Sequence, residues 1–227
     1  MTGYKRPRSN STWIWIAVVV AAVVIAAVVA IVTSGDDPPA ASDGTVTTDV
    51  SGSAVAGLSE TQPVTIVGAE LPPLDDPAND PAVGTKAPVL EGFRFDGSPI
   101  TIDPADGPVM VVFLAHWCPH CNREVPRLIQ WKATGTVPAD LRVFAVTTAA
   151  APDRDNYPPS KWMRNIQWPT EWDALADSVN QDASLAYGVS AFPFFVIVGS
   201  DGLVKARDSG EKEITELQSI VAAALAG

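Results

Sequence analysis

The sequence predicts an α/β fold that is preceded by one N-terminal transmembrane helix and a disordered linker. Three observations lead to this prediction: an uncharged apolar run over residues 13–32, a polar and acidic stretch over residues 33–83, and alternating strand-like and helix-like segments over residues 84–227. Strands that are separated by helices favour parallel pairing within one sheet. We therefore expect a short N-terminus (1–12), a membrane anchor (13–32), a flexible linker (33–83) and one folded domain (84–227).

The predicted anchor is a run of 20 residues, 13–32, without a charge, a proline or a glycine. A helix of that length covers roughly 30 Å, which is the thickness of the hydrocarbon core of a membrane. Lys5, Arg6 and Arg8 precede the run and acidic residues follow it, so the positive-inside rule places the N-terminus in the cytoplasm. A cleavable signal peptide is the alternative, but Ala30 offers a poor cleavage site. We expect a single-pass protein of the cell membrane with its C-terminal domain outside the cytoplasm.

The predicted linker is rich in proline, alanine, serine, threonine, glycine and aspartate. Residues 33–81 carry nine acidic side chains and no lysine or arginine. Such a composition favours a solvated chain because it offers little apolar surface to bury. Residues 64–67 could form a short strand, and the sequence leaves open whether this part of the linker docks on the folded domain.

The folded domain is predicted from changes in the period of its apolar residues. The expected strands are a hairpin over residues 88–102, a buried strand over 109–115, and further strands over 141–148, 194–199 and 203–207. The expected helices begin at residue 119, cover residues 159–167 and 182–187, and close the chain after residue 210. This order of elements predicts one domain of ordinary size.

The stretch 115–121 contains both cysteines and both histidines of the chain. It follows a buried strand and opens a helix, so the first cysteine, Cys118, should lie at the helix N-terminus, where free N–H groups and the helix dipole stabilise a thiolate. Cys121 follows one helical turn later and could close a disulfide with Cys118. We infer reversible thiol–disulfide exchange, with Cys118 as the attacking thiol and Cys121 as the resolving thiol.

Three other kinds of site compete with thiol–disulfide exchange at this stretch. A structural disulfide normally closes a long loop, and a two-residue gap does not. Structural zinc needs four ligands, and the sequence has no second cluster of cysteine and histidine. Copper binding by His116, Cys118, His120 and Cys121 is the stronger alternative, because thiolate and imidazole both suit copper. It would make the protein a metallochaperone, whereas the exchange enzyme needs no cofactor.

The net charge of −11 and the two cysteines exclude further classes. An acidic chain without a basic patch is an unlikely nucleic-acid binder, so no nucleic-acid partner is expected. Two cysteines in one motif also exclude a disulfide-rich secreted scaffold.

The motif Trp117-Cys118-Pro119-His120-Cys121 resembles that of the thioredoxin superfamily, and Cys-x-x-Cys-x-x-Glu-x-Pro, from Cys118 to Pro126, resembles its membrane-anchored TlpA/ResA branch. The likeness extends over residues 84–227. It implies a thioredoxin-like fold, which is a mixed central sheet flanked by helices, and thiol–disulfide exchange outside the cytoplasm. The implied partners are protein thiol or disulfide substrates and an unidentified redox partner that could be embedded in the membrane.

The resemblance also implies roles for two residues outside the cysteine pair. Many thioredoxins carry a buried acid six residues before the first cysteine, where this chain has Val112, and Glu124 could take its place as the proton acceptor. The alternative is an ordinary surface glutamate. Pro193 should be cis and face the disulfide, with the backbone of Phe192 free to pair with an extended substrate segment.

The residues expected to tune the redox couple are Trp117, Pro119, His120 and His116. A protonated His120 in the first helical turn would stabilise the Cys118 thiolate, and His116 could approach it from the loop side. The Pro-His dipeptide is similar to that of the DsbA-type oxidases, whereas the rest of the domain resembles a branch that commonly reduces its clients. We expect an oxidising or near-balanced couple. Peroxidase activity is not expected, because the Pro-x-x-x-Thr-x-x-Cys loop of the peroxiredoxins is absent.

Overall fold

A computed structural model describes residues 58–226 of the chain. The predicted cytoplasmic N-terminus, the transmembrane helix over 13–32 and the first part of the linker lie outside these residues and stay predictions. Among the described residues, no helix combines the length and apolarity needed to cross a membrane.

The centre of the domain is a five-stranded mixed sheet with the order β6-β5-β4-β7-β8. Its strands are β4 (Val109–Leu114), β5 (Arg142–Thr147), β6 (Ala174–Ala176), β7 (Phe194–Val198) and β8 (Val204–Ser209). The β4, β5 and β6 strands run parallel to one another, whereas β7 is antiparallel to β4 and β8 is antiparallel to β7. All six residues of β4 are buried, because helices cover one face of this strand and a second sheet covers the other. The predicted strands of this sheet are confirmed, except that β6 was not predicted.

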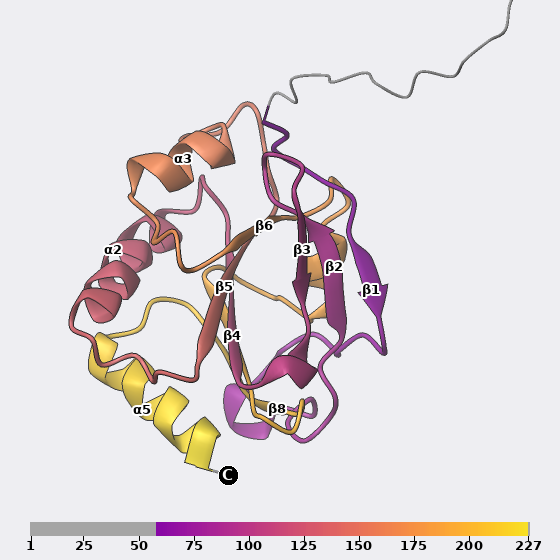
Figure 1. The fold of residues 1–227 in the computed structure, drawn as a ribbon, viewed down its shortest axis with the longest axis vertical. Helices are drawn as coiled ribbons and strands as arrows, with labels where there is room; N and C mark the ends of the chain where they lie inside the picture. Colours follow the sequence, from indigo (N-terminus) through magenta and orange to yellow (C-terminus); the bar gives the residue numbers. More distant parts are fainter. Residues whose placement is uncertain (1–57, 227) are drawn as a thin grey trace, which may run out of the picture. The chain divides into compact units, whose positions relative to one another are not determined.

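The second sheet has three antiparallel strands in the order β1-β2-β3. They are β1 (Thr65–Val67), β2 (Val89–Phe93) and β3 (Pro99–Ile102). Figure 1 shows this sheet on one side of the central sheet, with α2, α3 and α5 on the other side. The predicted hairpin over residues 88–102 is confirmed. The open question about residues 64–67 is answered, because residues 65–67 form β1 and pair with β2.

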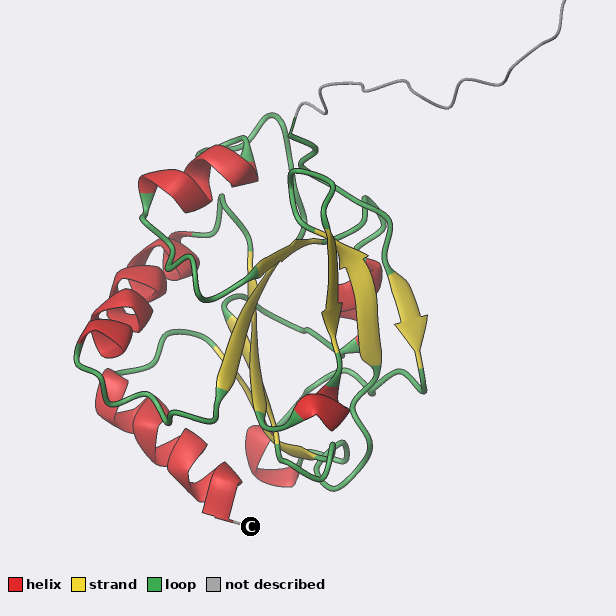
Figure 2. Ribbon diagram, in the orientation of Figure 1, coloured by secondary structure: helices red, strands yellow, loops and turns green. Residues whose placement is uncertain are grey.

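Four α-helices complete the described part of the domain, and Figure 2 shows where they lie. They are α2 (Pro119–Ala133), α3 (Pro159–Asn165), α4 (Asp182–Ala186) and α5 (Ile214–Ala226), and two short 3-10 turns occur at Pro77–Asn79 and Pro104–Asp106. The α2 helix begins at a proline, which is favourable because the first N–H of a helix has no intrahelical partner. Its apolar face buries Val125, Leu128 and Trp131 against the central sheet. The helix that contains Cys121 is therefore packed firmly against the core.

The predicted boundary of the folded domain at residue 84 is wrong, because residues 58–83 pack onto the domain. Leu71, Leu74 and Ala82 are buried in the same core as the second sheet. Asp80 forms a fully buried ion pair with Arg207 of β8, and its carboxylate accepts two bonds from the guanidinium. A composition typical of a linker conceals these anchors, because only a few side chains of the segment are buried and many of its other bonds to the domain involve the backbone.

Candidate active site

Cys118 lies where β4 ends and α2 begins. It occupies the N-cap position of α2 in an extended backbone conformation, and Pro119 forms the first helical residue. Cys118 is 6% exposed, Cys121 is completely buried, and both thiols are free. Cys118 is therefore the less buried of the two cysteines, although it is itself largely covered.

The loop before β7 covers Cys118. The Cys118 thiol donates to the carbonyl oxygen of Phe192 at 3.6 Å, and the Phe192–Pro193 peptide bond is cis, as predicted. The ring of Phe192 packs edge-on against the ring of Trp117, with 6.2 Å between their centroids. The proline loop and the cysteine turn therefore form one surface around the Cys118 sulfur.

Cys121 differs from Cys118 in its surroundings. Burial raises the pKa of the Cys121 thiol far above its usual value, a bond from the Ala115 backbone opposes this, and the charges of Cys118 and Glu124 add to the rise. A thiol with such a pKa stays protonated at neutral pH and needs a base before it can act as a nucleophile. Cys121 therefore needs help to lose its proton, and its environment differs from that of Cys118.

Glu124 is buried, which was the condition for its predicted role in proton transfer. Its Oε2 accepts from the backbone N–H of Lys212 at 3.0 Å and from Arg127 Nη1 at 3.4 Å, whereas its Oε1 has no hydrogen-bond partner among the described residues. Burial raises the pKa of Glu124, against the opposing effects of Lys212 and Arg127. A carboxyl group with an unused oxygen and a raised pKa is suited to exchange a proton near a buried thiol.

His116 turns both ring nitrogens to the loop over residues 149–158, which gives its predicted approach to the Cys118 thiolate no support. Its ring is buried and Nδ1 donates to the carbonyl oxygen of Asp155 at 2.7 Å, while Nε2 accepts from the N–H of Ala151 at 3.1 Å. This arrangement requires a neutral ring, and burial lowers the pKa of His116 accordingly. His116 therefore holds the loop over residues 149–158 and adds no charge to the site.

His120 is exposed, and its ring bonds to an acidic side chain. Its Nδ1 lies 2.7 Å from Glu211 Oε1, and Arg123 binds the same carboxylate oxygen at 2.7 Å. The bonds from Arg123 and His120 lower the pKa of Glu211 to about 2. Any positive charge on His120 therefore faces a carboxylate, which reduces its effect on Cys118.

The four side chains of the copper alternative do not form a metal site. Both ring nitrogens of His116 are occupied by backbone groups, and His120 is turned to Glu211. Within residues 58–226, no group of three or more histidine, cysteine, aspartate or glutamate side chains is arranged to hold a metal ion. The geometry thus gives copper binding no support.

Sequence reasoning missed the polar network behind the cysteine turn. Asn122 Nδ2 donates to the carbonyl oxygens of His116 and Cys118 at 3.1 and 2.9 Å. Its Oδ1 accepts from Trp162 Nε1 at 2.8 Å and from Asn156 Nδ2 at 3.3 Å. Asn122 thereby fixes the backbone on both sides of Trp117. The position directly after the second cysteine was the only available signal for it.

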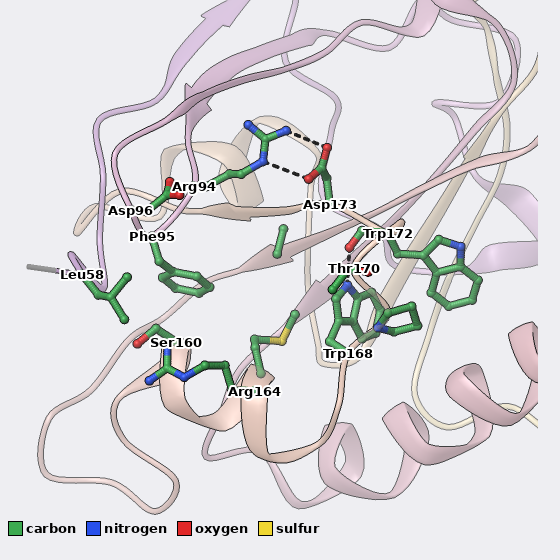
Figure 3. Close-up of a pocket in the computed structure, with 13 residues that line it drawn as sticks. Leu58, Arg94, Phe95, Asp96, Ser160, Arg164, Trp168, Thr170, Trp172 and Asp173 are labelled. Carbon is green, nitrogen blue, oxygen red and sulfur yellow. Dashed lines mark hydrogen bonds and ion pairs between the residues drawn. The ribbon is translucent and has the colours of Figure 1, made fainter. Parts of the chain in front are cut away.

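A separate hollow of about 300 Å³ lies beside α3, which contributes part of its lining (Figure 3). Trp168, Trp172 and Phe95 give it largely apolar walls, and the ion pair of Arg94 with Asp173 lies at its edge. None of its lining residues comes from the cysteine turn or the proline loop. This hollow is therefore not part of the thiol site.

The chain matches the model of one known protein family. The model of the AhpC/TSA family matches residues 83–207, which is more than half of the sequence. The chain belongs to the AhpC/TSA family. The matched region of this AhpC/TSA member includes the cysteine turn, α2 and the proline loop, but ends before α5. No curated protein matches the chain.

Solved structures agree on the fold of this AhpC/TSA member. A candidate thiol:disulfide interchange protein DsbE from Chlorobium tepidum has a TM-score of 0.51 and 23% identity, with 63% of this chain and 96% of that one covered. A thioredoxin-family interchange protein from Chlorobium tepidum TLS has a TM-score of 0.50 and 19% identity, with 62% and 95% covered. The thioredoxin domain of a thiol-disulfide oxidoreductase from Bacteroides vulgatus has a TM-score of 0.50 and 21% identity, with 62% and 96% covered. The thioredoxin-like fold is confirmed.

Proposed function

We propose that this protein is a thiol:disulfide oxidoreductase that exchanges disulfides with protein substrates through Cys118 and Cys121. One observation carries the proposal: a little-exposed thiol at the N-terminus of α2 faces the Phe192 carbonyl, and a fully buried thiol follows one turn later. Helix N-termini favour thiolates, and the buried partner is protected from outside thiols. The family and the fold are compatible with this chemistry.

The reaction proceeds in two exchanges that conserve electrons. The Cys118 thiolate attacks one sulfur of a substrate disulfide, which forms a mixed disulfide and releases the first substrate thiolate. Cys121 then loses its proton and attacks the Cys118 sulfur, which releases the second substrate thiolate and closes the Cys118–Cys121 disulfide. The reverse sequence oxidises a substrate dithiol. Glu124 is the group best placed to take the Cys121 proton, because both are buried and their charges interact.

Trapping of the mixed disulfide tests the proposal. Cys121→Ala removes the resolving thiol, so the full chain should accumulate a covalent adduct with a disulfide substrate through Cys118. Cys118→Ala, the matched control, should accumulate little, because Cys121 is inaccessible. Non-reducing electrophoresis and mass spectrometry of the adduct measure both. Equal trapping by the two variants would contradict the proposal.

The location outside the cytoplasm is part of the proposal and rests on the sequence. Residues 13–32 are long and apolar enough to span a bilayer, and cations precede them. Full-length chain expressed in cells should remain in the membrane fraction after extraction at alkaline pH, and protease added outside should reach the domain. Recovery in the soluble fraction with a shortened N-terminus would identify a cleaved signal peptide instead. A membrane location would also allow a membrane-embedded redox partner.

The direction of transfer is proposed to be oxidising or near balance. Support comes from the Pro119-His120 dipeptide and from the helix N-terminus, both of which favour the thiolate and therefore the reduced form of the protein. The equilibrium with glutathione should give a reduction potential above that of thioredoxin, about −270 mV, and His120→Ala should lower it. A potential as low as that of thioredoxin, unchanged in His120→Ala, would assign the protein as a reductant.

A further inference from the structure

The loop over residues 149–158, here called the active-site loop, is fastened to the cysteine turn. Four of its groups bond His116 or Trp117. They are the carbonyl oxygens of Ala149 and Asp155, the N–H of Ala151 and the side-chain amide of Asn156, at 2.8, 2.7, 3.1 and 3.0 Å from their partners. A loop bonded at four points offers a preorganised surface, so binding to it costs little conformational entropy.

Arg154 lies on this loop, between the bonded positions. Its side chain is exposed, and its guanidinium carbon lies 4.9 Å from the centroid of the Trp117 ring. Among the ion pairs of residues 58–226 none includes Arg154, although Asp153 and Asp155 are its neighbours in sequence. A guanidinium stacked on an aromatic face keeps the N–H groups of its edge available to a carboxylate.

The position of Arg154 places this charge on the ring of Trp117, the residue that precedes Cys118. Trp117, on which it stacks, precedes Cys118 and packs against Phe192, whose carbonyl oxygen contacts the Cys118 thiol. At the start of α2, the Arg123 guanidinium and the His120 ring are both already bound to Glu211. In the described part of the chain, Arg154 is thus the cation at this surface that has no acidic partner.

We propose that Arg154 selects substrate proteins that carry an aspartate or glutamate close to their reactive cysteine. The inference rests on the proposed function, since a substrate segment has to lie across Cys118 while the mixed disulfide forms. Its acidic side chain then meets the edge of the Arg154 guanidinium in a two-point bond. Because the pair is exposed, the preference should be about two- to fivefold and should weaken with salt.

Three peptide disulfides test the proposal. Each is a symmetric dimer of one short peptide, identical except for a glutamate, glutamine or lysine next to the single cysteine. The reduced full-length chain transfers two electrons to the dimer and becomes the Cys118–Cys121 disulfide, and two peptide thiols are released. The second-order rate constant is measured for each dimer at low and at high salt, where the expected order is glutamate, glutamine, lysine.

Charge reversal supplies the decisive variant. Arg154→Glu should invert the order of the three peptides, an outcome that partial unfolding cannot produce. Arg154→Met, which keeps an apolar stem on Trp117, should bring the glutamate-to-glutamine ratio close to one. Arg164→Glu is the matched control, because Arg164 is exposed on α3 at the separate hollow. It should keep the original order.

Two results would overturn the proposal. One is an unchanged order in Arg154→Glu, and the other is an equal change in Arg164→Glu, which would show an effect of net charge alone. Failure of the proposed function looks different, because no peptide would then react and Cys118→Ala would equal the parent chain. Equal rates for all three peptides with the parent chain would leave the exchange reaction intact and refute only the role of Arg154.

Discussion

Both faces of the central sheet bury ionisable groups, but the groups on one face are fully hydrogen-bonded and some of those on the other are not. On the face covered by the N-terminal segment and the second sheet, the Arg207 guanidinium bonds Asp80 twice and also donates to the carbonyl oxygens of Pro72 and Tyr187. On the face covered by α2, α3 and α5, Glu124 keeps one oxygen without a partner, and the Cys121 thiol has a strongly raised pKa.

The difference indicates which buried charges stabilise the fold and which serve chemistry. Burial raises the pKa of Asp80, but the bonds from Arg207 and from the N–H of Ala82, together with the charge of Arg207, outweigh it, and the net direction is down. The pKa of Glu124 moves up, because its partners do not offset burial. A buried group with all its bonds made is held in one state, whereas an incompletely bonded group can change its protonation at little cost.

The largest effect is expected on the fully bonded face. Arg207→Met leaves the Asp80 carboxylate buried without its partner, so the free energy of unfolding should fall by about 3–5 kcal/mol. Urea denaturation measures it. Arg94→Met is the matched control, because Arg94 binds Asp173 through two bonds of similar length but at the surface. It should cost about 1 kcal/mol or less. Similar losses in both variants would remove the distinction between the two pairs.

Glu124→Gln tests the other face. If the carboxylate takes the proton of Cys121, the resolving step should slow by about a hundredfold, which corresponds to about 2.7 kcal/mol in the barrier. The acidic limb of the pH–rate profile should also disappear, because glutamine does not titrate. Stopped-flow measurement of the single turnover between pH 4 and 9 checks both. The control Glu213→Gln removes the same charge from an exposed partner of Arg127. An unchanged profile in Glu124→Gln would assign Glu124 a structural role only.

A smaller effect is expected at His116, which is buried but fully bonded on the face that carries the chemistry. Burial lowers the pKa of His116 in the folded chain, so the unfolded chain, with a histidine pKa of about 6.5, takes up the proton first. The contribution of His116 to the free energy of unfolding should therefore be fully present above about pH 6.5 and should decrease as the pH falls below that value.

His116→Gln keeps one donor and one acceptor but does not titrate. It should lose about 1 kcal/mol at pH 8 and show a weaker decline toward pH 5 than the parent chain. Urea midpoints at the two pH values measure this. A parent chain and variant with the same decline would show that another group causes the pH dependence.

The sequence was most informative where a strong local pattern coincides with an element. The buried run of β4, the cysteine pair and the proline that opens α2 together place Cys118 correctly. The short β6 strand was missed, because three residues, Ala174–Ala176, cannot display a period. The N-terminal segment was misassigned, because its attachment depends on Arg207, which lies 127 positions after Asp80. The local composition of a segment cannot reveal a bonding partner that lies so far away in the sequence.

The same limit applies to the candidate site. The burial of Glu124 follows from its helical spacing with Cys121 and Leu128, which are also buried, so the sequence contained that signal. The orientation of His116 could not be inferred, because both of its partners are backbone groups of the active-site loop, 35 and 39 positions away. Backbone groups have no residue type, and a sequence pattern therefore cannot point to them.

The ion pair between Asp80 and Arg207 has a practical consequence for anyone who shortens this protein. Starting the chain at Gly84, where the composition changes, would remove Asp80 and the carbonyl of Pro72 while Arg207 stayed in β8. Three of the four bonds of that guanidinium would be lost in one cut. It would also remove β1, which pairs with β2, and the buried side chains of Leu71 and Leu74 from the core that they share with the second sheet. Recombinant versions for crystallisation or enzymology should therefore begin no later than Leu58.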